Sequence, residues 1–350
     1  MATSMATLPI WSLGGLLILT ALVQGAVSYQ WSPLSTGVTA RLRGVSAISD
    51  RVAWASGANG TIVRTTDGGA TWTPLAVPGA GKLDFRDVDA IDDKTAYVLS
   101  IGEGELSRIY KTTDAGAAWT EQFVNKDPNG FFDAMAFWDA TRGVAVGDSI
   151  DGQFVILTTS DGGRTWSRVP ATALPPALPN EGFFAASGTN VTVLPPNHVW
   201  LGTGAASEAR VLHSSDGGRT WSLARTPLAA GPSAGIFSIA FADPTHGIVV
   251  GGDYKTEGVA GDNAALTSDG GKTWTLMKGL SGFRSVAAYA PGNAKGIVAV
   301  GPAGTDISHD AGKTWTPVAG AGYHAFCFAR RGTIGFGVGE KGTAGKLVAK

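Results

Sequence analysis

The sequence has little cysteine, little charge and few histidines, and these shortages argue against disulfides, nucleic-acid binding and a metal site respectively. Cys327 is the only cysteine, so no internal disulfide stabilises the fold, and its place in the apolar run FCFA predicts a buried thiol. Charged residues make up 16% of the chain and the formal net charge is −1. A phosphate-binding surface normally carries a clear basic excess, so this balance argues against nucleic acid as a partner.

The chain also lacks the patterns of common catalytic and cofactor sites. Its five histidines have no spacing typical of a metal site, and neither a phosphate loop nor a nucleophile elbow is present. We therefore expect no metal and no cofactor. What is abundant is glycine, at 50 of 350 residues and without a collagen period. Such a composition suits many short strands joined by tight turns, which predicts an all-β fold.

The first 28 residues contain no charged side chain and have an apolar stretch from about Leu8 to Val23. This length fits the apolar region of a signal peptide, and Ala26-Val27-Ser28 is a small-x-small cleavage candidate before Tyr29. An uncleaved membrane anchor is the alternative. Either reading places the remainder of the chain outside the cytosol, in the periplasm or the extracellular space. We expect residues 29–350 to form one domain.

One eight-residue string recurs six times, from TTDGGATW at 65–72 to SHDAGKTW at 308–315. Its aspartates are spaced 41 to 55 residues apart, and periods in this range indicate a propeller or another repeat array. The six aspartates are Asp67, Asp114, Asp161, Asp216, Asp269 and Asp310.

The spacing within the string has a physical explanation. An aspartate that opens a turn accepts hydrogen bonds from the backbone N–H groups ahead of it, and a glycine two positions later adopts a positive φ without steric cost. The threonine and tryptophan that follow are expected to start the next strand, with the indole ring buried against a neighbouring blade. We therefore interpret the six aspartates as structural rather than catalytic.

Each repeat predicts four strands. In the second unit they are LDFRDVDAID, TAYVLSI, SRIYKTTD and AAWTEQF, and the third and fifth units repeat this order. Alternating apolar positions, β-branched residues and breaks at Gly or Asp mark each run as a strand. Four strands per unit are typical of a propeller blade.

The two ends of the chain predict how the ring closes. After the sixth unit, which ends near Val318, the tail supplies three strands but no fourth. The string QWSPL at 30–34 matches the fourth-strand strings TWTPL at 71–75 and TWTPV at 314–318. We therefore expect a seven-bladed β-propeller of four-stranded blades, in which an N-terminal strand completes the C-terminal blade and removes an exposed sheet edge.

The recurring string is identified as the Asp-box, or BNR repeat, of bacterial neuraminidases and several other β-propeller families. The unit AWASGANGTIVRTTDGGATW at 53–72 resembles a narrower group, the photosystem II stability/assembly factor family and its bacterial relatives. The strings RGVAVGD, HGIVVGG and GIVAVGPAG extend this resemblance over nearly all of residues 29–350. The resemblance implies an exported seven-bladed propeller, and a role as an assembly factor that binds proteins.

A candidate binding site follows from aligning the starts of the innermost strands, which read LRG, FRD, FDA, FAA, FSI, FRS and YHA. Their middle positions form a predicted ring at one mouth of the central channel, where loop ends that bind ligands gather. The ring comprises Arg43, Arg86, Asp133, Ala185, Ser238, Arg284 and His324. We expect Glu181, Tyr254 and Lys255 to reach the same mouth.

Three arginines beside a histidine suit a carboxylate, a phosphate or an acidic peptide segment. In the alternative interpretation, these charges pair with one another and with water in the channel. The function that the sequence favours is an exported, monomeric and non-catalytic propeller that binds a protein or an anionic ligand at the channel mouth. It would assist the assembly of a membrane complex.

A glycoside hydrolase is the alternative function, because sialidases and xyloglucan-cleaving enzymes share the Asp-box. Such enzymes need two acidic groups, or a tyrosine with an acid, facing the sugar. Sialidase-like chains also carry an arginine in an R-I-P context, which this sequence lacks. The acidic candidates are Asp133, Glu181 and Asp87, so the sequence leaves the question of catalysis open.

Overall fold

The computed structural model describes Met1 and residues 28–350. The predicted signal peptide and its cleavage site therefore lie almost wholly outside the described residues. Within the described part, the chain forms 28 β-strands and three short 3-10 helices, namely η1 (Gly104–Leu106), η2 (Ala171–Ala173) and η3 (Glu340–Gly342). None of these helices has the length or the apolar character needed to span a membrane.

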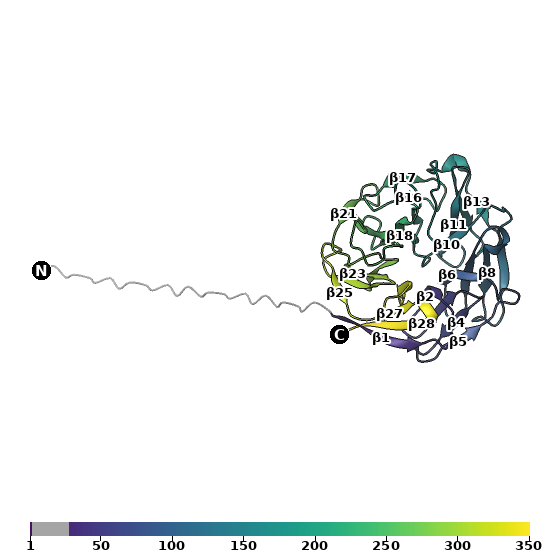
Figure 1. The fold of residues 1–350 in the computed structure, drawn as a ribbon, viewed down its shortest axis with the longest axis horizontal. Helices are drawn as coiled ribbons and strands as arrows, with labels where there is room; N and C mark the ends of the chain where they lie inside the picture. The colour runs from purple at the N-terminus through teal and green to yellow at the C-terminus, as the bar shows by residue number, and fades with distance from the viewer. Residues whose placement is uncertain (2–27) are drawn as a thin grey trace.

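The strands form seven antiparallel sheets of four strands each, arranged as blades around a ring (Figure 1), which confirms the predicted fold class. Blade 1 contains β2 (Leu42–Ala47), β3 (Ala53–Gly57), β4 (Ile62–Thr65) and β5 (Thr73–Leu75). Blade 2 contains β6 (Asp84–Ala90), β7 (Ala96–Ile101), β8 (Arg108–Thr112) and β9 (Thr120–Val124). Blade 3 contains β10 (Phe132–Phe137), β11 (Gly143–Ile150), β12 (Gln153–Thr159) and β13 (Ser167–Arg168).

The other half of the ring follows the same plan. Blade 4 contains β14 (Val191–Leu194), β15 (His198–Gly202), β16 (Arg210–Ser214) and β17 (Ser222–Arg225). Blade 5 contains β18 (Ala234–Phe241), β19 (Gly247–Asp253), β20 (Ala264–Thr267) and β21 (Thr275–Met277). Blade 6 contains β22 (Val286–Ala290), β23 (Asn293–Gly301), β24 (Gly304–Ser308) and β25 (Thr316–Val318).

Blade 7 joins the two ends of the described chain, as the sequence predicts. Three of its strands come from the C-terminus, namely β26 (Ala325–Phe328), β27 (Gly335–Val338) and β28 (Thr343–Ala349). The fourth and outermost strand is β1 (Tyr29–Ser35), which pairs antiparallel with β28 from Tyr29↔Ala349 to Ser35↔Thr343. Figure 1 shows β1 and β28 side by side at the rim of the ring.

The six aspartate turns make the hydrogen bonds that their spacing predicts. In the turn between β20 and β21, the carboxylate of Asp269 accepts the backbone N–H and the hydroxyl of Thr273, at 3.0 and 2.6 Å. The hydroxyl of Thr267 donates to the same carboxylate and accepts the N–H of Gly271, which has a φ of 91°. The structure differs in one detail, because each tryptophan lies just before its strand rather than within it.

These turns predict a loss of stability in acid. Hydrogen bonds from Thr273 hold the pKa of Asp269 at about 2, below its ordinary 3.8. A carboxylate with a lowered pKa contributes stability that is complete above its unfolded pKa and is lost as the pH falls through the folded one. We therefore expect Asp269→Asn to lower the melting temperature at pH 6, and the gap from the unchanged protein to shrink between pH 4 and pH 2. A gap that stays constant over this range would contradict the assignment.

The hydrophobic core lies between adjacent blades, where the faces of the sheets pack together. The ring of Trp119 from blade 2 packs edge-on against Trp54 of blade 1, with centroids 6.3 Å apart. Trp72 likewise joins a cluster that contains Phe336 of blade 7. Cys327 contacts the same cluster, and although the residue as a whole is half-buried, burial of its thiol raises the pKa to about 12.

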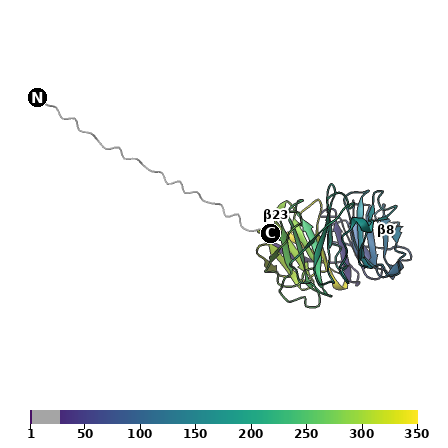
Figure 2. The same cartoon turned by 90° about the horizontal axis from the view of Figure 1, so that it is seen from above.

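The path of the strands separates the loops into two faces. Each aspartate turn lies beside the loop between the first and second strands of its blade, as in the bond from the Gly68 N–H to the Arg51 carbonyl. Connections from second to third strands, and from one blade to the next, lie at the other ends of the strands. Figure 2 shows the ring edge-on, with loops at both ends of the strands. We call this second side the pocket face, because the cavity described below opens on it.

Candidate functional site

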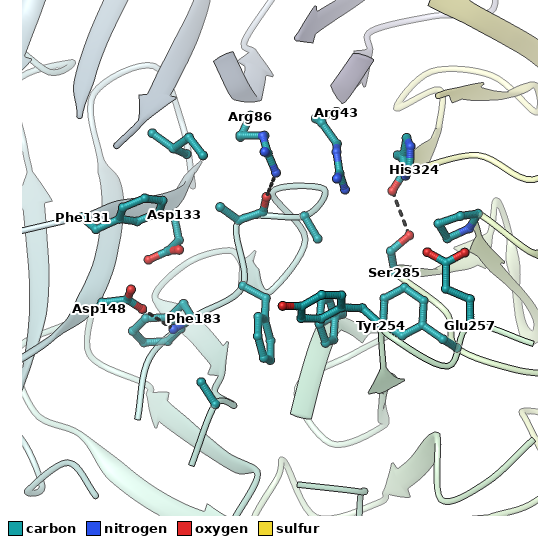
Figure 3. A pocket seen from close by; sticks show the side chains of 18 of the residues that line it. Arg43, Arg86, Phe131, Asp133, Asp148, Phe183, Tyr254, Glu257, Ser285 and His324 are labelled. Carbon is teal, nitrogen blue, oxygen red and sulfur yellow. Dashed lines mark hydrogen bonds between the residues drawn. The ribbon is translucent and has the colours of Figure 1, made fainter. Parts of the chain in front are cut away.

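The cavity on the pocket face has a volume of about 520 Å³ and lies where the innermost strands begin. Its volume is within the range of small-molecule and peptide side-chain sites. Arginines from blades 1 and 2 line one side, and the carboxyl groups of Asp133 and Asp148 from blade 3 line another (Figure 3). Aromatic rings from the connection into blade 4 and from blades 5 and 6 form a wall, and Glu257 of blade 5 lies beside Tyr254 in it. The predicted ring at the channel mouth therefore exists in part, with a different membership.

β-Bulges place the side chains that the sequence predicted correctly. The strand registers of β2, β6 and β10 each shift by one residue at their start, which leaves Arg43, Arg86 and Asp133 without a cross-strand partner. A bulge re-aims the side chain of its extra residue. All three side chains line the cavity, so these predicted positions do meet at one site.

Arg43 is a half-buried cation without a partner. Its guanidinium makes no ion pair with any described residue, and its buried Nε atom has no hydrogen-bond acceptor within the described chain. Burial, together with Arg86 and Arg41, lowers the pKa of Arg43 to about 10, so the group remains charged at neutral pH. A buried donor that is charged and unsatisfied is costly, and an anion placed beside it would offset that cost.

Arg86 holds the floor of the cavity in place. Its Nε atom donates to Asp84 at 2.9 Å, and its Nη1 atom donates to the carbonyl oxygen of Ala185 at 2.8 Å (Figure 3). Ala185 belongs to the connection that leads from blade 3 into blade 4. In this connection the hydroxyl of Ser187 donates to the Ser285 carbonyl of blade 6 at 2.9 Å. The connection therefore crosses the centre of the ring and forms the floor of the cavity.

Gly188 shows how closely this connection approaches blade 2. Its φ is +76°, and a Cβ atom at this position would lie 2.2 Å from Oδ1 of Asp87. Only glycine satisfies both conditions without displacing the carboxyl group. Asp87 itself is fully enclosed and accepts the backbone N–H of Met135 at 2.8 Å. Asp87 thus joins blades 2 and 3 rather than facing the cavity.

An aromatic wall lies opposite the arginines. Phe184 stacks on Phe237 with centroids 4.0 Å apart and planes within 7°, and Phe283 meets Phe237 edge-on at 4.6 Å. Tyr254 covers both stacked rings at 6.2 and 6.1 Å, and its side chain is exposed. Tyr254 was predicted to reach the mouth and lines the cavity. The three phenylalanines were not predicted as site residues.

The carboxyl groups of blade 3 form the third surface. Asp133 is 1% exposed, and its Oδ2 atom has no hydrogen-bond partner in the described residues. Burial, followed by the nearby Asp148, raises the pKa of Asp133 well above its ordinary value. Asp148 on β11 accepts the Phe183 N–H at 2.9 Å, and burial raises the pKa of its carboxyl group as well. Sequence reasoning missed Asp148.

His324 lines the cavity but does not add to its positive charge. Burial, and then the charge of Arg43, lowers the pKa of His324 to about 4, so the ring is neutral at pH 7. Its Nε2 atom lies 2.8 Å from a carboxylate oxygen of Glu340. His324 was predicted in the ring and lines the cavity as an uncharged ring.

Arg284 and Glu181 are not at the cavity, contrary to the sequence-based prediction. Arg284 is 1% exposed and turns into blade 6, where it forms an ion pair with Asp306 at 2.6 Å. Ser285 faces the cavity in its place. Glu181 is buried beside Arg210, with which it forms an ion pair, and also accepts the Thr203 hydroxyl at 2.7 Å. Both charges are satisfied internally, as buried charges must be.

Two further positions differ from the prediction. In blade 5 the register shift lies between Ile236 and Ser238, so Phe237 is the residue that faces the cavity. Ser238 is buried and accepts the backbone N–H of Ala287 at 3.0 Å. Lys255 is exposed next to Tyr254, and its side chain is not part of the cavity lining.

Fold and site together define a closed seven-bladed propeller with a floored cavity on one face. Two solved structures with this fold are YCF48 bound to a D1 peptide, with 19% identity and a TM-score of 0.66, and YCF48 from Cyanidioschyzon merolae, with 17% and 0.65. Both alignments cover 91% of this chain, and they cover 97% and 98% of the respective YCF48 chains. The architecture that the family resemblance implied is thus confirmed.

Other propellers share the same architecture. The WD40 propeller domain of Doa1 aligns with a TM-score of 0.63 and 13% identity, over 91% of this chain and 97% of that domain. No protein family matches the chain by sequence, and no curated protein is significantly similar to it. The likeness therefore establishes the fold, and function has to be argued from the cavity.

Proposed function

We propose that this protein is an exported, monomeric and non-catalytic propeller that binds a segment of a protein partner in the cavity of the pocket face. An anionic group of that segment would meet Arg43. The single observation that carries the proposal is the half-buried and unpaired guanidinium of Arg43, in a cavity whose opposite wall is aromatic. Charge on one side and aromatic rings on the other suit a peptide that has a carboxylate next to an apolar side chain.

Two further points support a peptide rather than a free anion. Within residues 28–350, three large apolar side chains are exposed, and all three lie in loops of the pocket face: Leu106, Tyr254 and Val259. A propeller of this fold, YCF48, has been solved with a D1 peptide bound. We extend the proposal to assistance in the assembly of a membrane complex. The exported location rests on the uncharged leader at residues 1–28.

Peptide binding tests this proposal directly. Short peptides that end in phenylalanine, with either a free or an amidated C-terminus, would be titrated against the protein by fluorescence polarisation. We expect the free carboxylate to be required, and Arg43→Gln to weaken binding by roughly 10- to 100-fold, which corresponds to a lost hydrogen bond to a charged group. Arg331→Gln is the matched control, because Arg331 is 70% exposed and pairs with Asp93, away from the cavity lining.

Equal binding by Arg43→Gln, or equal binding of the amidated peptides, would contradict the proposed function.

The glycoside hydrolase is the second candidate, and one observation favours it: Asp133 and Asp148 both line the cavity, and Asp133 has the raised pKa of a general acid. Asp87 and Glu181, the other acids considered, face elsewhere. Sugar release from an aryl glycoside panel that disappears in Asp133→Asn would favour the hydrolase over the binding protein.

A further inference from the structure

At the end of the cavity formed by Asp133 and Asp148, one carboxyl oxygen has no hydrogen-bond partner among the described residues. Asp133 is almost fully enclosed, and its carboxyl group points into the cavity (Figure 3). Its Oδ2 atom lacks a hydrogen-bond partner anywhere in the described chain. Asp148 stands beside it on the neighbouring strand and also lines the cavity. A buried oxygen of this kind carries the full cost of losing its water.

No cation of the cavity lining forms an ion pair or a hydrogen bond with either carboxyl group among the described residues, and the charge of Arg86 offsets only part of the effect of burial on the pKa of Asp133. The lining contains two arginines, and Arg43 makes no ion pair within residues 28–350. Arg86 directs its Nε atom to Asp84 and its Nη1 atom to the Ala185 carbonyl. Asp148 accepts only a backbone N–H, from Phe183. A ligand with N–H groups at this end of the cavity would donate the hydrogen bond that Oδ2 of Asp133 lacks within the described residues.

We propose that Asp133 and Asp148 bind the ammonium or guanidinium group of a lysine or arginine side chain, in the same peptide segment whose carboxylate meets Arg43. This inference rests on the proposed function and narrows it to peptides that carry both charges. The aromatic wall suits the methylene stem of a basic side chain, which packs on apolar surfaces while its charged end reaches a polar partner. The cavity thus recognises two groups of opposite charge in one peptide.

Binding of this kind releases a proton. Burial and then Asp148 raise the pKa of Asp133 in the free protein, against the opposing charge of Arg86, so its carboxyl group holds its proton to a higher pH than an exposed aspartate does. An adjacent ammonium group favours the ionised carboxylate and therefore lowers that pKa. The proton leaves the Asp133 carboxyl group for solvent as the ion pair forms. Affinity for a lysine-containing peptide should consequently rise with pH, whereas affinity for a peptide without a basic side chain should not.

Three synthetic peptides test the inference on the whole protein. They are N-acetylated Gly-Gly-Phe-Lys with a free C-terminus, the same acetylated peptide with norleucine in place of lysine, and the acetylated lysine peptide with an amidated C-terminus. Norleucine keeps the stem and removes the charge. We expect it to bind roughly tenfold more weakly than lysine, and calorimetry in phosphate and Tris buffers at pH 7 to detect proton release with lysine alone.

Variants of the protein test whether Asp133 and Asp148 cause the preference for the lysine peptide. Asp133→Asn should remove both the preference for lysine over norleucine and the proton release. Asp148→Asn should reduce the preference in the same direction, which provides a second variant if one of them fails to fold. Asp93→Asn is the matched control, since Asp93 is exposed and lies outside the cavity lining.

The outcomes separate this inference from the proposed function. Lysine and norleucine peptides that bind equally, with an amidated peptide that does not bind, would overturn the inference and leave the proposed function standing. Failure of every peptide with a free C-terminus to bind at about 1 mM would contradict the proposed function, and this inference with it. A preference for lysine that persists in both Asp133→Asn and Asp148→Asn would also overturn the inference.

Discussion

Replacing Trp31 with alanine is expected to lower the free energy of unfolding by about 3–5 kcal/mol, the usual cost of truncating a buried aromatic ring. Trp31 is 6% exposed on β1 and packs against Tyr323, with ring centroids 4.4 Å apart, and against Phe326 at 5.8 Å. Its indole N–H also donates to the Thr305 hydroxyl of blade 6 at 3.1 Å. One side chain therefore fastens the closing strand to two blades, and chemical unfolding monitored by fluorescence would measure its contribution.

Gln30→Ala provides the control for this experiment, because Gln30 lies on the same strand with an exposed side chain, and such changes usually stay within about 0.5 kcal/mol. Deletion of residues 29–35 should be more severe. It removes the whole of β1 and leaves the edge of β28 unpaired, a template for aggregation that light scattering would detect. If Trp31→Ala unfolds at the same denaturant concentration as Gln30→Ala, the closing strand does not stabilise the ring.

Features that depend on local spacing could be predicted from the sequence. The turn at Asp269 needs only residues 267 to 274, and the backbone N–H bond to its carboxylate repeats at each of the six aspartate turns. Ring closure could be predicted for a related reason: the string QWSPL at 30–34 matches the fourth strand of other blades. Its partner had to be the one blade with three strands, and the register Trp31↔Leu347 shows that it is.

The candidate site could be predicted only in blades where the bulged residue occupies the same position of the aligned strand. Arg43 and Arg86 occupy equivalent bulge positions in blades 1 and 2, so aligning their strands placed both correctly. In blade 5 the aligned string FSI is displaced by one residue, and a displacement of one residue reverses which side chains face the cavity. A bulge leaves no clear mark in the sequence, so Phe237 and Ser238 were exchanged.

Long-range pairing accounts for the other errors. Glu181 was expected at the mouth, but Arg210 lies 29 positions away in sequence and pairs with it inside blade 4. The floor of the cavity was also unforeseen, since Ser187 bonds to a residue 98 positions away. The aromatic wall had a visible signal, because phenylalanine opens several of the aligned strings. The sequence-based prediction used only the middle positions of those strings and assigned no role to the phenylalanines.

The ion pair of Arg284 and Asp306 leads to the second large expected effect. Arg284→Met should lower the free energy of unfolding by about 3–5 kcal/mol, because it leaves the fully buried Asp306 carboxylate without its cation. The Nε atom of Arg284 donates to Asp306 at 2.9 Å, and its Nη1 atom donates to the Phe283 carbonyl at 2.7 Å. Urea unfolding would measure the change.

A double replacement separates this structural role from a role in binding. Arg284→Met combined with Asp306→Leu removes both charges, and replacing a buried ion pair by apolar side chains is often nearly neutral, so most of the stability should return. Arg225→Met is the control for losing a surface pair, with Glu208, and should cost less than about 1 kcal/mol. In the double variant the folded protein should bind the carboxylate peptides as the unchanged protein does. Lost peptide binding with unchanged stability would instead return Arg284 to the ring of binding residues.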